Sequence, residues 1–152
     1  MTHQNWQFWL ASACFSLLLA GVPSQAQRII KPIAPQFTPD PLVYAGTTEG
    51  NAPMQNLVAD AKVAGNCQGL ASPNPSHVLT ITKTMSSLSL RVTAPNPITI
   101  LVRGKDGILC RSGLNPEIMG AWSEGKYDIW IGSVSGDRLN YRLSLSEGRQ
   151  SP

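Results

Sequence analysis

The chain is poor in the residues on which most enzymes and nucleic-acid-binding proteins depend. It has only two histidines, and charged residues make up 14% of its 152 residues. The twelve Lys and Arg residues are spread singly along the sequence and form no cluster. Both nucleic-acid binding and attachment to a membrane through a polybasic patch need concentrated positive charge, so the sequence argues against both.

No apolar run is long enough to cross a bilayer comfortably. The longest, residues 8–22, has the length of a signal-peptide core, and residues 23–26 place small side chains at the −3 and −1 positions of a cleavage site. We therefore predict a signal peptide over residues 1–26, cleaved after Ala26, and a secreted or periplasmic protein. Because the segment before the apolar run lacks Lys and Arg, a retained N-terminal anchor stays open as the alternative.

Cysteine is also scarce, with Cys14 in the apolar run and Cys67 and Cys110 in the remainder. Cleavage would remove Cys14 and leave an even pair in an oxidising compartment, which favours a disulfide. Two thiols without histidine or acidic companions cannot complete a tetrahedral metal shell. We predict a Cys67–Cys110 disulfide, with two free buried thiols as the alternative.

Four prolines, at positions 32, 35, 39 and 41, crowd the segment after the predicted cleavage site. Proline fixes φ and lacks an N–H group, which excludes a helix and a central strand. We predict an extended linker over residues 27–40 and a domain that opens at residue 41.

Apolar and polar residues alternate through most of the remaining chain, which places one face of each strand in a core. The expected strands are 41–45, 77–83, 87–93, 98–103, 108–110, 117–122, 126–132 and 138–146. About seven or eight short strands at this spacing predict an all-β fold, an antiparallel jelly-roll-like β-sandwich over residues 41–147. Residues 148–152 are expected to form a disordered tail.

Two connections between these strands differ in clarity. Residues 104–107 read Gly-Lys-Asp-Gly, a strong hairpin signal because Asp-Gly tolerates the positive φ of a tight turn. Residues 54–64 are ambiguous, since their apolar spacing fits a helix while the all-β surroundings favour an edge strand.

Several short motifs recur in one order along the chain. They are PSHVLTI at 75–81, LNPEI at 114–118, GAW at 120–122, GKYDIWIG at 125–132 and YRLSLSE at 141–147. Together they resemble the bacterial pre-peptidase C-terminal-like β-sandwich family, over residues 40–147. The resemblance implies a non-catalytic, secreted, jelly-roll-like domain of a kind often appended to exported hydrolases and associated with secretion, substrate attachment or calcium-stabilised loops.

The sequence departs from that family where calcium would bind. Family members often follow the second cysteine with an acidic loop, whereas Arg111, Ser112 and Gly113 follow Cys110 here. Calcium needs about six oxygen ligands, largely from carboxylates. We therefore predict no cofactor and no metal, with calcium disfavoured.

Catalytic groups are sparse. His77 is the only histidine outside the predicted signal peptide, and the serines of Gly-Ser-Val-Ser-Gly at 132–136 do not occupy the centre of a Gly-x-Ser-x-Gly motif. We predict a protein without enzymatic activity. A small secreted hydrolase remains a remote alternative.

The best binding candidate on a strand is Trp130. If Tyr127 and Ile129 face the core, Trp130 faces outward, as do Arg91 and Arg142 in the same phase. An outward tryptophan can stack on a sugar ring, pair with an arginine, or be covered by the predicted N-terminal linker.

The expected loop from Cys110 to Glu117 gives the other candidates, Asn115 and Glu117, because sandwiches place function on end loops. We predict a binding or accessory module for an envelope or extracellular protein or glycan, without nucleic acid and without a membrane span after processing. The alternative is a structural envelope protein or export accessory with no discrete ligand. The sequence leaves the oligomeric state open.

Overall fold

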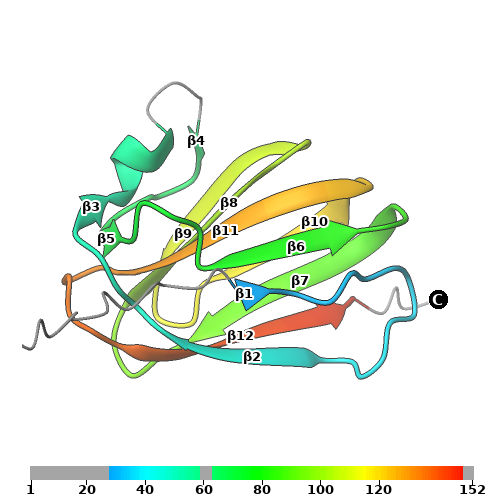
Figure 1. The fold of residues 1–152 in the computed structure, drawn as a ribbon, viewed down its shortest axis with the longest axis horizontal. Coiled ribbons are helices and arrows are strands. Elements are labelled where there is room, and N and C mark those ends of the chain that lie inside the picture. Colours follow the sequence, from blue (N-terminus) through cyan, green and yellow to red (C-terminus); the bar gives the residue numbers. More distant parts are fainter. Residues whose placement is uncertain (1–27, 59–62, 149–152) are drawn as a thin grey trace, which may run out of the picture.

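A computed structural model describes residues 28–58 and 63–148, which form two β-sheets packed face to face (Figure 1). The predicted signal peptide and residues 149–152 of the predicted tail lie outside the described residues. The described part contains twelve strands and one short 3-10 helix, η1 (Met54–Val58). The predicted all-β, two-layered fold is confirmed.

The smaller sheet is antiparallel throughout. Its order is β10 (Glu117–Trp122), β7 (Met85–Thr93), β12 (Asn140–Glu147) and β2 (Leu42–Thr47). Leu90 pairs with Ile118 on one side and with Leu145 on the other. This register carries the apolar positions of three neighbouring strands to the same inner face.

The larger sheet has β6 (His77–Ile81), β11 (Gly125–Ser133), β8 (Ile98–Gly104) and β9 (Gly107–Gly113) at its centre, all antiparallel. Short strands extend it: β1 (Arg28–Ile29), β3 (Ala52–Pro53), β4 (Val63–Ala64) and β5 (Leu70–Ala71). β1 runs parallel to β6, and β4 runs parallel to β9. The prediction of a wholly antiparallel sandwich is therefore wrong for these two short edge pairings.

Eight strands have five or more residues, in agreement with the predicted seven or eight. The four additional strands have two residues each, too few to show an alternating pattern. The predicted hairpin is confirmed, because Gly104 pairs with Gly107 and Gly107 has a φ of 111°. β9 continues to Gly113, so the predicted loop from Cys110 shrinks to residues 114–116.

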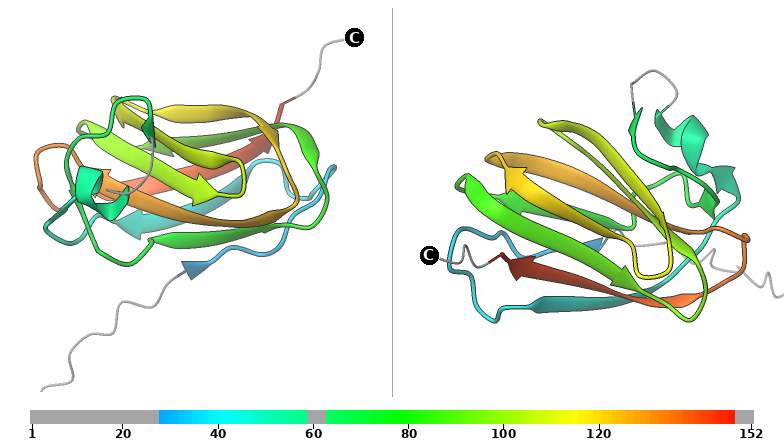
Figure 2. Two further views of the ribbon diagram at one scale, coloured as in Figure 1. Left: turned by 90° about the horizontal axis from the view of Figure 1, so that it is seen from above. Right: turned by 180° about the vertical axis from the view of Figure 1, so that it is seen from behind.

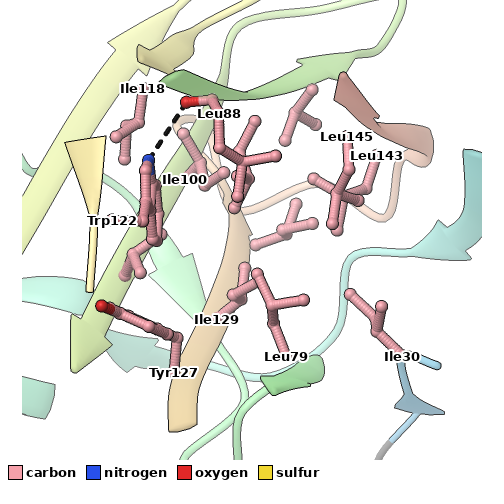
Figure 3. Packing of buried hydrophobic residues seen from close by; sticks show 14 of the residues in the cluster. Ile30, Leu79, Leu88, Ile100, Ile118, Trp122, Tyr127, Ile129, Leu143 and Leu145 are labelled. Atoms are coloured by element: carbon pink, nitrogen blue, oxygen red, sulfur yellow. Dashed lines mark hydrogen bonds between the residues drawn. The ribbon is translucent and has the colours of Figure 1, made fainter. Parts of the chain in front are cut away.

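One apolar cluster fills the space between the sheets (Figure 3). The alternating residues expected in the core are buried there: Leu79, Ile81, Leu88, Leu90, Val92, Ile98, Ile100, Val102, Tyr127, Ile129, Ile131, Tyr141, Leu143 and Leu145. Trp122 lies at 4.9 Å from Tyr127 between ring centroids, and its indole Nε1 donates to the Leu88 carbonyl over 3.1 Å.

The predicted linker is wrong from residue 28 onward, because the segment is part of the domain. Ile30 and Ile33 are 0% and 2% exposed and belong to the central core. Their amides donate to the carbonyls of Val78 and Thr80 over 2.9 and 3.0 Å. Prolines are tolerated here because the segment pairs along the edge of β6, where it needs ladder hydrogen bonds on one side only.

Residues 52–58 and 63–73, which we call the covering segment, lie over the outer face of the larger sheet (Figure 2). Both readings of residues 54–64 are partly right, since the segment contains η1 and then β4, with residues 59–62 outside the described part. A second apolar cluster lies between this segment and the sheet: Met54, Cys67 and Ala71 from the segment, and Leu101, Ile108, Cys110 and Trp130 from the sheet.

The predicted disulfide joins the covering segment to the sheet. Cys67 and Cys110 are bonded, with their Cα atoms 5.3 Å apart. Within the ranges 28–58 and 63–148, no helix combines the length and hydropathy that a bilayer span needs.

Candidate binding site

The outer face of the smaller sheet is open to solvent. Because Leu143 and Leu145 point into the core, the residues between and beside them on β12 point outward. We call this surface the open face; its outward residues include Val43, Arg91, Glu117, Met119, Arg142 and Ser144. Three of the five predicted binding residues, Arg91, Glu117 and Arg142, lie on it.

Arg91 and Glu117 are partners across β7 and β10 and form an ion pair of 2.8 Å. The Ser89 hydroxyl also donates to the Glu117 carboxylate. The Ser89 hydrogen bond and the Arg91 guanidinium hold the pKa of Glu117 below its usual range. Glu117 is thus ionised at neutral pH, and its carboxylate is already bound by Arg91 and Ser89.

An open hollow of about 550 Å³ lies at one end of the smaller sheet. It is formed by the end of β2, the start of β12, the turn after β7, and β1. Its lining residues are Arg28, Ala45, Gly46, Thr47, Thr93, Ala94, Pro95, Asn140, Tyr141 and Arg142. We call it the Arg28–Arg142 hollow. Arg142 is the one predicted binding residue among its lining.

The lining of this hollow contains two arginines and no Asp or Glu. Arg28 donates to the backbone carbonyl of Ala45, whereas none of the ion pairs within the described ranges uses Arg142. Asn140 accepts a hydrogen bond from the Thr47 hydroxyl over 3.0 Å. The hollow therefore combines uncompensated positive charge with small polar groups.

The Tyr141 phenol forms an inner wall of the hollow and lies 2.9 Å from Nε2 of His77. Burial, with the Arg28 cation nearby, lowers the pKa of His77 to about 4, so its imidazole is neutral at pH 7. Burial also raises the pKa of Tyr141 to about 12. A Cβ at Gly46 would lie 2.3 Å from Cζ of Tyr141, so only glycine leaves room for the phenol there.

Trp130 faces outward as predicted, yet its proposed stacking on a sugar is wrong because the ring is only 3% exposed. The covering segment lies over it, and its indole Nε1 donates to the Pro73 carbonyl over 3.2 Å. The Arg103 guanidinium lies 4.9 Å from the ring centroid. The apolar run Ile100-Leu101-Val102 in the adjacent strand was the available signal that both faces of that strand are buried.

Asn115 lies in the short loop between β9 and β10 and is not part of the hollow. It is exposed and has a φ of 50°, a left-handed conformation that asparagine tolerates better than most residues. Its neighbour Leu114 is also exposed. The structure thus gives Asn115 a role in the turn and separates it from Arg142.

Sequence reasoning missed Arg28, Thr47 and Asn140 as site residues. Arg28 was not predicted because the prolines that follow it indicated a linker. The adjacent apolar pair Ile29-Ile30 was the available indication that this segment packs against the domain. Thr47 and Asn140 lie at strand ends that meet only through the β2–β12 register. That register is a long-range property that local patterns do not give.

No group of three or more His, Cys, Asp and Glu side chains suited to a metal ion occurs in the part of the chain that the structure describes. The expectation that calcium is not bound remains a prediction.

No protein-family model matches the chain. The chain is similar to an uncharacterized protein of Synechococcus elongatus, with 33% identity over 90 residues. The match covers 55% of this chain and 66% of the relative, so the chain spans slightly less than two thirds of that protein's length. Because the relative is itself uncharacterized, the similarity supplies no activity, and the function has to be argued from the site.

Proposed function

We propose that this protein is an exported, non-catalytic binding module that recognises a glycan or protein partner through its open face. The observation that carries the proposal is the difference between the two outer faces. The covering segment buries the part of the larger sheet's outer face around Trp130, while Arg103 and Lys126 on the same face stay exposed. The smaller sheet presents Arg91, Arg142 and the hollow to solvent. Exposed Val43 and Met119 add apolar area to the same face.

Two features support export. Stable disulfides form in oxidising compartments, and Cys67–Cys110 is such a bond. The first described strand begins at Arg28, so cleavage after Ala26 would leave the fold intact.

We also propose that the sandwich has jelly-roll connectivity. Its long strands follow the orders β2–β12–β7–β10 and β6–β11–β8–β9 in the two sheets. Each order places an early strand beside a late one, as two interleaved Greek keys would. This arrangement supports the resemblance to the pre-peptidase C-terminal-like family.

The chemistry of the described residues favours binding over turnover. His77 is buried and neutral, and its Nε2 is engaged with Tyr141. Glu117 is held as an ionised, ion-paired carboxylate, which is unsuited to a general acid.

Retention of the purified protein on immobilised polysaccharides and on envelope protein fractions tests the proposal. The double variant Arg91→Ala/Arg142→Ala should lose at least about tenfold in affinity, since charged hydrogen bonds contribute about 1.5–3 kcal/mol each. The matched control is Lys83→Ala/Lys105→Ala, which removes the same charge from exposed positions at the ends of strands of the larger sheet.

Equal retention of both double variants would contradict recognition through the open face. Envelope association without any saturable partner would instead favour the alternative, a structural envelope or export accessory.

A further inference from the structure

We propose that the Arg28–Arg142 hollow binds the carboxylate groups of an acidic polysaccharide built from uronic acid units. The inference rests on the proposed binding function and names the class of ligand that the open face would recognise.

The charge of the hollow selects an anion. Two arginines, Arg28 and Arg142, line it without an acidic residue in the lining. Among the described acids, Glu49 is paired with Arg138 at 3.0 Å, and Glu117 is paired with Arg91 at 2.8 Å. A guanidinium presents parallel N–H groups that match the two oxygens of a carboxylate. A carboxylate entering the hollow would therefore meet available N–H donors and a positive electrostatic potential.

The groups beside the arginines suit sugar hydroxyls. Thr47 and Thr93 contribute hydroxyls and Asn140 contributes an amide to the same lining. These groups both donate and accept hydrogen bonds, as ring hydroxyls do. A uronic acid unit carries its carboxylate and several hydroxyls on one ring, and this combination matches the lining.

An acidic peptide fits the same place less well. An extended peptide gains most of its affinity by adding a strand to a free sheet edge. β2 is such an edge strand of the smaller sheet, but the Arg28 side chain donates to its Ala45 carbonyl. A peptide strand would have to displace this arginine, which would remove part of the positive charge that attracts it.

The inner wall of the hollow is fixed before any ligand arrives. Tyr141 is 4% exposed, is hydrogen-bonded to buried His77 over 2.9 Å, and fits closely under Gly46. A preformed wall lowers the entropic cost of binding. The hollow can thus hold a ligand without rearrangement of the core.

Titration calorimetry with polygalacturonate tests the proposal on the purified full chain. The comparison ligands are methyl-esterified polygalacturonate, poly-glutamate and neutral dextran. We expect binding to polygalacturonate that weakens as salt rises and that is lost on esterification.

Arg142→Gln should weaken binding of polygalacturonate at least about tenfold. Lys83→Gln, which removes the same charge from an exposed position outside the lining, should stay within about twofold.

Equal weakening of binding by Arg142→Gln and Lys83→Gln would overturn the inference, as would binding of the methyl ester as tight as that of the acid. Binding of poly-glutamate tighter than that of polygalacturonate would also overturn it and would assign the hollow to acidic peptides. If polygalacturonate fails to bind while a neutral polysaccharide or an envelope protein is retained by the open face, this inference fails and the proposed function stands. If nothing is retained, both fail.

Discussion

Nε2 of His77 lies 2.9 Å from the phenol oxygen of Tyr141 and so links β6 of the larger sheet to β12 of the smaller one. Both side chains are buried, and their rings meet edge to face at 5.9 Å between centroids. This polar contact therefore joins the two sheets through the interior. It also connects the core to the wall of the Arg28–Arg142 hollow.

The stability of the protein should fall between pH 6.5 and pH 4 because of His77. Its pKa is about 4 in the fold and 6.5 for an ordinary histidine, so the unfolded chain takes up a proton first as the pH falls. The stabilisation is complete above pH 6.5 and is lost towards pH 4, with a total of about 3 kcal/mol. Urea unfolding at a series of pH values measures the slope.

His77→Gln is the variant for this test, since glutamine can still reach a hydroxyl but does not titrate. It should flatten the loss of stability between pH 6.5 and pH 4.5. An equal slope in wild type and His77→Gln would assign the acid sensitivity to other groups.

Gly46→Ala should destabilise the protein by about 1–3 kcal/mol, as overpacking in a filled core does. The added Cβ would lie 2.3 Å from Cζ of Tyr141, and the phenol is held by His77. Gly120→Ala is the matched control, because a Cβ there has no heavy atom within 4 Å. Thermal unfolding compares the two, and a neutral Gly46→Ala would show that the phenol can move aside.

Removing the disulfide through Cys67→Ser/Cys110→Ser should lower the free energy of unfolding by up to about 4 kcal/mol in the chain-entropy account of a loop of 43 residues. The covering segment should also loosen, because Cys67 lies within it. Acrylamide quenching of Trp130 fluorescence, read as the difference from Trp130→Phe, should then increase. Unchanged unfolding and quenching would show that packing alone holds the segment.

Trp130→Ala should cost about 3–5 kcal/mol of stability, as expected for a large buried aromatic. Arg142→Ala, at an exposed position on the open face, should change stability by less than about 0.5 kcal/mol. Chemical denaturation of both variants separates a core residue from a surface residue. A fully stable Trp130→Ala that has lost ligand binding would restore the interpretation of Trp130 as a stacking platform.

The central strands were predictable because each carries a local signal. Leu88, Leu90 and Val92 alternate within the single strand β7, and Asp106-Gly107 marks the turn between β8 and β9 without reference to the rest of the chain. The pairing of Cys67 with Cys110 followed from their number once Cys14 was assigned to the predicted signal peptide.

The parts that failed depend on contacts between distant segments. The prolines around Ile30 and Ile33 correctly exclude a central strand, but they do not reveal that β6 offers an edge to pair with. The phase of β11 gives the direction of Trp130, whereas its burial depends on residues 52–73 folding back over it. The hollow is likewise assembled from four separate chain segments.

The covering segment gives the molecule a front and a back. A partner that binds the open face would hold the domain in one orientation only, with the Cys67–Cys110 disulfide and Trp130 on the side away from the contact. Many copies fixed along a polymer would then all display the same rear surface to the surrounding medium.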